Sequence, residues 1–201
     1  LLSAEYPEAT MDDSYAIQRA LVERKLATGR RVIGWKIGLT SRAMQQQLNI
    51  TTPDSGVLLD DMAFDSGATI PADRFIAPRI EAEIAFVMKA PLAGEVTRDQ
   101  VLAATDYVTP ALEILDTRIV RAEGGKTRTI IDTIADNAAN AGIVTGSQRH
   151  TPTADLRWVG AIVKRDGVVE ETGLGAGVLD DPVTGIIWLA RRMHHYGQRI
   201  E

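Results

Sequence analysis

Hydrophobic residues recur with helical spacing in three parts of the chain. The first predicted helix runs from Met11 to Thr28, where Thr10 and Asp13 form a capping box and Gly29 ends the last turn. Its rough apolar stripe consists of Ile17, Ala20, Leu21 and Leu26. A second helix is expected to begin at the capping box Thr97–Gln100 and to end near Asp106. A third follows the pair Asp181–Pro182 and ends at Gly197.

Other segments show the two-residue alternation of β-strands. They are Arg31–Leu39, Arg79–Val87, Trp158–Lys164 and Val168–Thr172. The last two are joined at Asp166–Gly167, a strong hairpin signal. Strands outnumber helices, and there is no regular strand–helix–strand alternation. We therefore predict an α+β fold, a mixed and β-rich domain with flanking helices.

The two faces of the predicted strand Arg31–Leu39 differ in character. Ile33, Trp35 and Ile37 share one face, which we interpret as the core face. The opposite face carries Lys36 between Gly34 and Gly38. Glycines on both sides of a lysine leave space for another molecule to approach. The alternative is an exposed lysine on an edge strand.

The strand Arg79–Val87 places two carboxylates, Glu81 and Glu83, on one face of an otherwise apolar segment. Burying such a pair is costly unless a cation or protons neutralise it. Glu113 lies in a second apolar run, Pro110–Leu115, and also needs a partner. Three such oxygen ligands suit a hard divalent cation that keeps positions open for water and substrate. A solvent-facing surface is the alternative for the pair, and Asp116 is a competing third ligand if its segment is helical.

Composition excludes several classes of protein. The chain has 201 residues, of which 45% are hydrophobic and 24% charged, so it can form a hydrophobic core. A formal net charge of −5 argues against nucleic acid binding. The absence of cysteine excludes disulfide scaffolds, zinc–thiolate sites and thiol catalysis. The apolar runs are too short to span a membrane. We expect a cytoplasmic protein.

Four motifs resemble one family of enzymes. They are Gly34–Ser41, Pro53–Met62, Pro78–Phe86 and Asp136–Gly142. These segments are similar to the hydratase/decarboxylase family of the aromatic meta-cleavage pathways, within the wider fumarylacetoacetase-like group. The resemblance covers essentially the whole chain. It implies a mixed, β-rich fumarylacetoacetase-like fold and assembly into homo-oligomers, commonly decamers.

The resemblance also implies the site residues. It assigns a Mg²⁺ or Mn²⁺ ion to the acids Glu81, Glu83 and Glu113, an active-site lysine to Lys36 and an active-site acid to Asp54. Asp54 by itself looks like an ordinary turn residue. We expect a single catalytic domain over residues 1–201 with a helical part over about 1–30. Because family members extend beyond both Leu1 and Glu201, we expect this domain to be incomplete at both ends.

The expected reaction follows from the same resemblance. The segment Asp136–Gly142 favours members that add water to the diacid 2-oxohept-3-ene-1,7-dioate and form 4-hydroxy-2-oxoheptane-1,7-dioate in homoprotocatechuate catabolism. The alternatives are hydration of 2-hydroxypenta-2,4-dienoate, decarboxylation of 4-oxalocrotonate and a non-catalytic partner subunit. A C–C hydrolase is disfavoured because no histidine precedes His150. Arg79 and Arg118 are both candidates to bind the distal carboxylate.

Overall fold

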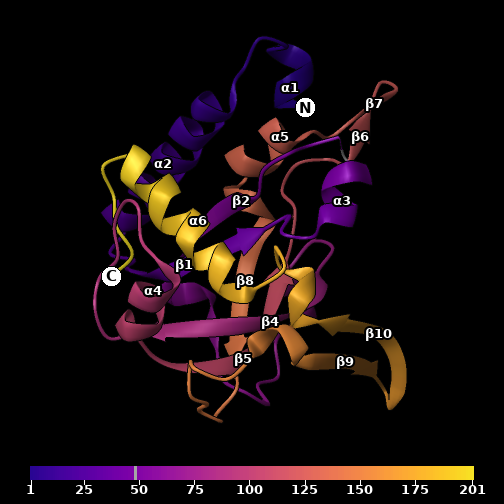
Figure 1. Cartoon of the computed structure of the whole chain (residues 1–201). Coiled ribbons are helices and arrows are strands. Elements are labelled where there is room, and N and C mark those ends of the chain that lie inside the picture. Colours follow the sequence, from indigo (N-terminus) through magenta and orange to yellow (C-terminus); the bar gives the residue numbers. More distant parts are fainter. Residues whose placement is uncertain (48) are drawn as a thin grey trace. The chain divides into compact units, whose positions relative to one another are not determined.

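The computed structural model describes residues 1–47 and 49–201 (Figure 1). The helices are α1 (Leu2–Glu5), α2 (Met11–Ala27), α3 (Arg42–Gln47), α4 (Arg98–Ala104), α5 (Ile130–Ala135) and α6 (Pro182–His195). The strands are β1 (Val32–Gly38), β2 (Asp54–Leu59), β3 (Ala63–Phe64), β4 (Arg79–Met88), β5 (Thr105–Leu115), β6 (Ala122–Glu123), β7 (Lys126–Thr127), β8 (Asn140–Thr145), β9 (Gly160–Arg165) and β10 (Val168–Leu174). This mixture of helices with mainly antiparallel pairs confirms the predicted α+β class.

The chain divides into two compact units. The first comprises Leu1–Gly38, Pro53–Glu81 and Glu113–Val144, and the second comprises Leu39–Thr52, Ala82–Leu112 and Thr145–Glu201. The prediction of one catalytic domain over 1–201 stays a prediction. In the described residues, no helix is both long enough and apolar enough to cross a membrane.

In the first unit, β1 and β2 form an antiparallel pair in which Lys36 lies opposite Gly56 and Gly38 opposite Asp54. A four-stranded sheet has the order β3-β8-β5-β4, so β4 and β5 are neighbours. The predicted core face of β1 is wrong: Ile33 is 50% exposed, and Trp35 and Ile37 are only half-buried. The register of β1 against β2 shifts between Val32 and Gly34, and this irregularity interrupts the alternation of faces.

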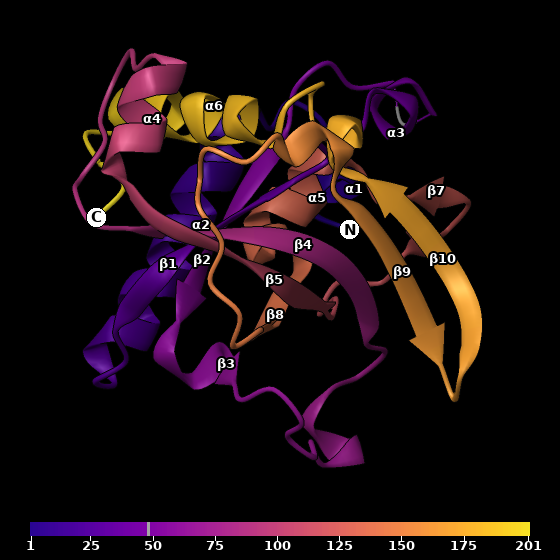
Figure 2. The same cartoon turned by 60° about the horizontal axis from the view of Figure 1, so that its bottom comes forward.

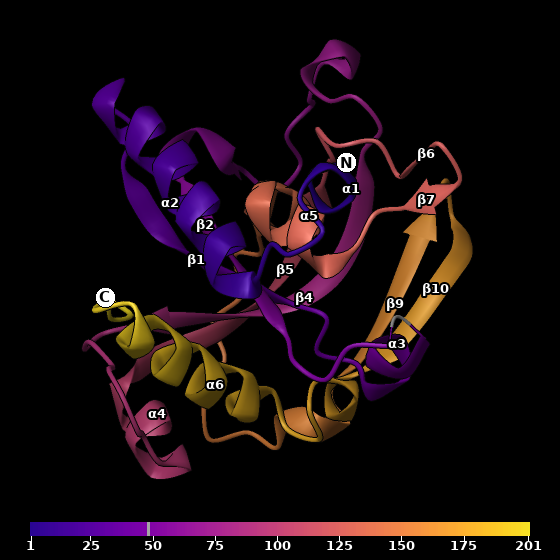
Figure 3. The ribbon, with the colours of Figure 1, turned by 90° about the horizontal axis from the view of Figure 1, so that it is seen from above.

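Helix α2 begins as predicted, with a complete capping box between Thr10 and Asp13. Its apolar stripe, however, does not face the core of the unit. Ile17, Leu21 and Leu26 are 42%, 37% and 39% exposed, and Ala20 is also exposed. The buried residues are instead Ser14, Tyr15 and Gln18. Hydrogen bonds explain this orientation, because Gln18 Nε2 donates to the carbonyls of Ser55 and Ile134. Figure 3 shows α2 beside α5, the helix that contributes Ile134.

The segment after α5 has an unusual backbone. Asn137, Ala138 and Ala139 all have φ near +55°, a left-handed conformation that is rare outside glycine. The Asn137 side chain forms two hydrogen bonds with the backbone of Val57, accepting from its N–H at 2.8 Å and donating to its carbonyl at 2.9 Å. Gly56 is required here, because a Cβ atom would lie 2.6 Å from the Asn137 carbonyl oxygen. The Asp136–Gly142 motif therefore fixes β2 in place.

In the second unit, α4 and α6 pack together, as Figure 3 shows. Both helices carry buried apolar residues, Val101 on α4 and Val183, Leu189 and Met193 on α6. Both helices begin at their predicted caps, Thr97 and Asp181. The hairpin β9–β10 turns at Asp166–Gly167, as predicted, and forms a long curved ribbon (Figure 2). Trp158 lies before β9, in a short 3₁₀ turn, and is not part of the strand.

Candidate active site

Lys36 lies in a tightly enclosed position on β1. Its side chain is only 10% exposed, so the alternative of an exposed edge lysine is wrong. A Cβ atom on Gly38 would overlap Asp54 Oδ1 and lie 2.7 Å from Lys36 Nζ. At Gly34 the nearest atom to such a Cβ is Leu58 Cδ1 at 3.6 Å, an ordinary contact. The space cleared by Gly38 is thus occupied by the side chains of Lys36 and Asp54.

Two buried carboxylates surround the lysine. Nζ of Lys36 lies 3.3 Å from Oε1 of Glu113, which β5 supplies. Asp54, at the start of β2, is 1% exposed, and its carboxylate accepts a hydrogen bond from the Gly38 N–H. Asp54 Oδ1 and Glu113 Oε1 are nevertheless buried without a well-directed hydrogen bond. Buried acceptors of this kind are costly unless a ligand or an ion satisfies them.

The pKa values of the three groups are strongly coupled. Burial opposes the charged form of Lys36, but the charges of Asp54, Glu113 and Glu81 outweigh it, so the lysine pKa is raised. Burial raises the pKa of Asp54, although Lys36 acts against this shift. Burial also raises the pKa of Glu113 to about 7, with Lys36 lowering it and Glu81 raising it. The site therefore combines a firmly protonated lysine with carboxyl groups that retain protons more readily than usual.

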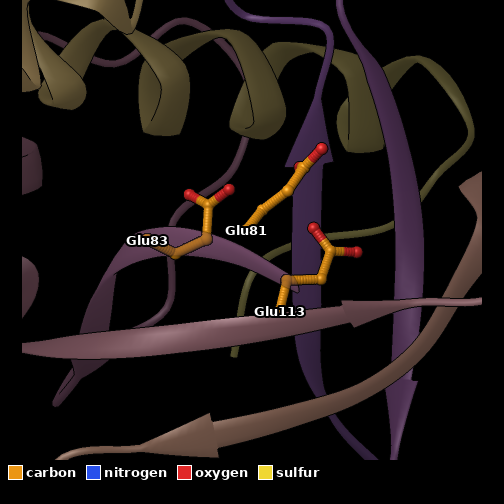
Figure 4. Close-up of side chains that lie close together, drawn as sticks. All are labelled: Glu81, Glu83 and Glu113. Atoms are coloured by element: carbon orange, nitrogen blue, oxygen red, sulfur yellow. The ribbon is translucent and has the colours of Figure 1, made fainter. Parts of the chain in front are cut away.

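The three predicted metal-ligating acids come together. One carboxylate oxygen from each of Glu81, Glu83 and Glu113 lies within 4.8 Å of the other two. Figure 4 shows the side chains converging, with Glu81 and Glu83 on β4 and Glu113 on β5. Glu113 is buried, Glu83 is half-buried and Glu81 is exposed. All-oxygen ligand sets of this kind suit hard divalent cations.

The structure decides between two alternatives that the sequence left open, namely Asp116 as a third metal ligand and Arg118 as the residue that binds the distal carboxylate. Asp116 follows a strand and not a helix, and its carboxylate accepts hydrogen bonds from the N–H groups of Ile76 and Ala77. It therefore has a structural role away from the cluster of glutamates. Arg118 is similarly committed to the fold, because its Nε lies 2.6 Å from Asp136 Oδ1 and its Nη2 donates to the Asp136 carbonyl.

Sequence reasoning missed the residues that hold Asp54. The N–H of the next residue, Ser55, donates to Tyr15 Oη at 3.1 Å, and its carbonyl accepts from Gln18 Nε2 at 2.9 Å. Tyr15 and Gln18 lie three positions apart on α2, on the face that the apolar stripe does not occupy. A tyrosine and a glutamine on a helix carry no local signal for this role.

The comparisons with known proteins identify close relatives. The chain is 50% identical to the 2-oxo-hept-4-ene-1,7-dioate hydratase of Escherichia coli, over 100% of this chain and 76% of the relative. It is 44% identical to a 2-keto-4-pentenoate hydratase of Paraburkholderia xenovorans over 96% of this chain and 71% of that protein. No family model matches the chain.

Solved structures show the same relationship. The 4-oxalocrotonate decarboxylase of Pseudomonas putida G7, complexed with magnesium and adipate, matches 99% of this chain and 75% of its own with a TM-score of 0.91 and 36% identity. A fumarylacetoacetate hydrolase family protein of Yersinia pestis shares the fold alone, with a TM-score of 0.52 and 15% identity over 78% of this chain and 73% of its own. The resemblance seen in the motifs is thereby confirmed. The chain belongs to the hydratase/decarboxylase family of the aromatic meta-cleavage pathways, whose fold is fumarylacetoacetase-like.

Proposed function

We propose that the protein hydrates a seven-carbon diacid, 2-hydroxyhepta-2,4-diene-1,7-dioate, through its 2-oxohept-3-ene tautomer. The observation that carries this proposal is the buried Lys36, which lies between Asp54 and Glu113 beside a cluster of three glutamates. The 50% identity to a hydratase of a 2-oxoheptenedioate supports the choice of substrate. The product is 4-hydroxy-2-oxoheptane-1,7-dioate.

A divalent cation, Mg²⁺ or Mn²⁺, fits the glutamate cluster. Glu81, Glu83 and Glu113 would hold it, and their carboxylate oxygens are already within 4.8 Å of one another. The magnesium in the related decarboxylase supports the same assignment. When bound, such an ion supplies Lewis-acid stabilisation of negative charge at the 1-carboxylate and 2-oxygen of a substrate.

Lys36 supplies positive charge and a proton donor to the 2-oxygen. Its three carboxylate neighbours keep it protonated, because they raise its pKa against the effect of burial. A cation at this position stabilises the negative charge that develops on the oxygen when the 2-hydroxyl gives up its proton. The dienolate then takes up a proton at C5, so the tautomerisation moves one proton and consumes none. The conjugated ketone that results is electrophilic at C4.

Asp54 serves as the proton shuttle for water. Burial raises its pKa, and its Oδ1 atom has no directed hydrogen bond within the protein. A carboxylate with a raised pKa and a free acceptor oxygen can remove a proton from an attacking water. Water then adds its oxygen to C4 and a proton to C3, so that the C3=C4 double bond becomes a single bond, one O–H bond of water breaks and one water molecule is consumed.

An absorbance assay tests the proposal. The loss of dienol absorbance is followed for the seven-carbon diacid and for 2-hydroxypenta-2,4-dienoate, with added Mg²⁺, with added Mn²⁺ and after chelation. We expect metal-dependent turnover that favours the diacid and yields the 4-hydroxy product. Full turnover after chelation would exclude the metal model, and preference for the five-carbon acid would instead favour the monoacid hydratase.

Decarboxylation is the second candidate, supported by the TM-score of 0.91 to a 4-oxalocrotonate decarboxylase. The same lysine and glutamate groups could stabilise the carbanion that remains after carbon dioxide leaves. Trapping carbon dioxide from 2-oxohex-3-enedioate separates this candidate from hydration. A third possibility, a non-catalytic subunit, would be revealed by activity that appears only when a decarboxylase partner is added.

We also propose that the protein forms a homo-oligomer. The family resemblance implies assemblies of up to ten copies of the chain. Exposed apolar side chains on the β9–β10 hairpin support self-association. Ile162, Val168 and Val169 are 66%, 64% and 52% exposed. Apolar residues clustered on an exposed ribbon favour burial against another protein surface.

A further inference from the structure

A cluster of arginines lies close together in the first unit. Arg121 and Arg128 flank the β6–β7 hairpin, and the Arg128 N–H donates to the Arg121 carbonyl at 2.8 Å, which places the two residues side by side. Arg79 begins β4 on the same face as Glu81. Burial lowers the pKa of Arg128, and the charges of Arg121 and Arg79 lower it further, although Asp136 and Asp132 oppose this effect. Three guanidinium groups therefore share one region.

Among the described residues, none of the three guanidinium groups pairs directly with a carboxylate. In residues 1–47 and 49–201, neither the Arg79 nor the Arg121 side chain forms a hydrogen bond or an ion pair. The half-buried Arg128 donates from Nη1 to Thr117 Oγ1, a neutral hydroxyl, at 2.6 Å. Arg118 differs sharply, because Asp136 neutralises it. The acids nearest to Arg128 are already engaged, because Asp136 pairs with Arg118 and Asp132 accepts hydrogen bonds from Ser3 and Thr129. Positive charges whose neighbouring acids are engaged elsewhere indicate a place for an anion from outside the chain.

Arg128 also lies near the candidate active site. Thr117 Oγ1, to which Arg128 donates, lies 3.5 Å from Asp136 Oδ2, and the next residue, Asn137, bonds to Val57 on β2, the strand that begins at Asp54. The charge of Arg128 also acts on Asp54, after the larger effects of burial, Lys36 and the Gly38 N–H. The single bond to Thr117 fixes the guanidinium and leaves other N–H donors for a carboxylate, which an arginine can bind through two parallel hydrogen bonds. Arg128 is thus better placed for this role than Arg118.

We propose that Arg128, with Arg79 and Arg121 around it, binds the distal carboxylate of the substrate and makes the site selective for dicarboxylates over monocarboxylates. This inference rests on the proposed function and identifies the residues that determine substrate class. The cluster supplies the positive charge that a second carboxylate requires, and a monoacid gains nothing from it.

The test compares diacid and monoacid in Arg128→Gln, Arg128→Lys and the wild-type protein, all with Mg²⁺. A matched control is Arg165→Gln, which removes an exposed arginine that pairs with Glu170 on the β9–β10 hairpin. Turnover is measured with 2-hydroxyhepta-2,4-dienedioate and 2-hydroxypenta-2,4-dienoate. Binding is measured by calorimetry with the unreactive pair heptanedioate and heptanoate.

We expect Arg128→Gln to lower kcat/KM for the diacid by about 10- to 100-fold, the range for a lost hydrogen bond to a charged group. The monoacid rate should stay within about 3-fold, because it lacks the distal group. The preference for heptanedioate over heptanoate should vanish in Arg128→Gln and return in part in Arg128→Lys. Arg165→Gln should match the wild type in every assay.

Equal losses for both acids, or no loss for either, would overturn the proposal. Calorimetry with heptanedioate and heptanoate separates failure of this proposal from failure of the proposed function. If no dienol is hydrated, but the preference for heptanedioate is present in the wild type and absent in Arg128→Gln, hydration is refuted and the dicarboxylate site upheld. If the wild type hydrates dienols yet binds both unreactive acids equally, the dicarboxylate site is refuted and hydration stands.

Discussion

At the scale of single residues, Gly38 determines whether Lys36 and Asp54 can approach each other. Replacing it with alanine would place a methyl group against Asp54 Oδ1 and 2.7 Å from Lys36 Nζ. We expect Gly38→Ala to fold but to lose about 100-fold or more in turnover, because displacing reacting groups by about 1 Å has effects of that size. The measurement is kcat/KM for the preferred dienol, with circular dichroism to verify the fold.

Gly34 provides the matched control for this prediction. It lies on the same strand, and its added methyl would meet only Leu58 Cδ1 at 3.6 Å. Gly34→Ala should therefore retain nearly full activity. Equal activity in the two alanine variants would show that the side chains can separate without consequence and would contradict the geometry assigned to this site.

Single residues also show how much of the site could be predicted from sequence. Lys36, Glu81, Glu83 and Glu113 stand out because strand alternation puts charge on faces of apolar segments. Their convergence follows from the pairing of distant strands, which the local pattern does not specify. Asp54 carries no such signal, because its burial arises only when β2 pairs with β1. It was identified through the resemblance alone.

At the scale of elements, local chemistry predicted helix ends better than helix faces. The caps at Thr10, Thr97 and Asp181 depend on neighbouring residues and were predicted correctly. The face of α2 depends on tertiary hydrogen bonds from Tyr15 and Gln18, so its apolar stripe was misleading. The left-handed run at Asn137–Ala139 had no glycine to indicate it and could not be predicted.

The contact between that left-handed run and β2 leads to a prediction about stability. Asn137→Ala removes both hydrogen bonds to the Val57 backbone, so we expect the free energy of unfolding to fall by about 2–4 kcal/mol. Asn140 donates only one hydrogen bond to the Val57 carbonyl, at 3.1 Å. Asn140→Ala should cost less. Urea denaturation of both variants provides the comparison, and an equal or smaller loss for Asn137→Ala would contradict this role.

At the scale of the whole molecule, the exposed apolar residues predict self-association. Ile162 is 66% exposed on β9, and Ile162→Glu would place a charge on the proposed contact surface. We expect this variant to dissociate to smaller species in light-scattering measurements at micromolar concentration. Lys164→Glu, a charge change at an already polar and exposed position of the same strand, should keep the native mass. An unchanged mass for Ile162→Glu would remove the hairpin from the interface.

The stability of the whole molecule should also depend on pH and on the cation together. Glu113 has a pKa of about 7 in the folded protein, above its ordinary value of 4.5. A group whose pKa is raised by folding contributes stability that is complete below the unfolded value and is lost as pH rises through the folded value. Without a cation, this contribution should therefore be lost between about pH 4.5 and 7.

A bound cation favours the charged carboxylates and reverses this loss. At about a hundredfold excess over Kd, binding adds roughly 2.7 kcal/mol of stability. We expect Mg²⁺ to raise the melting temperature clearly at pH 7.5 and much less at pH 5, where protons compete for Glu113. Glu113→Gln should abolish the difference, whereas the exposed control Glu8→Gln should preserve it. An increase of equal size at both pH values would mean that the cation binds elsewhere, because a ligand set containing Glu113 must release its proton on binding.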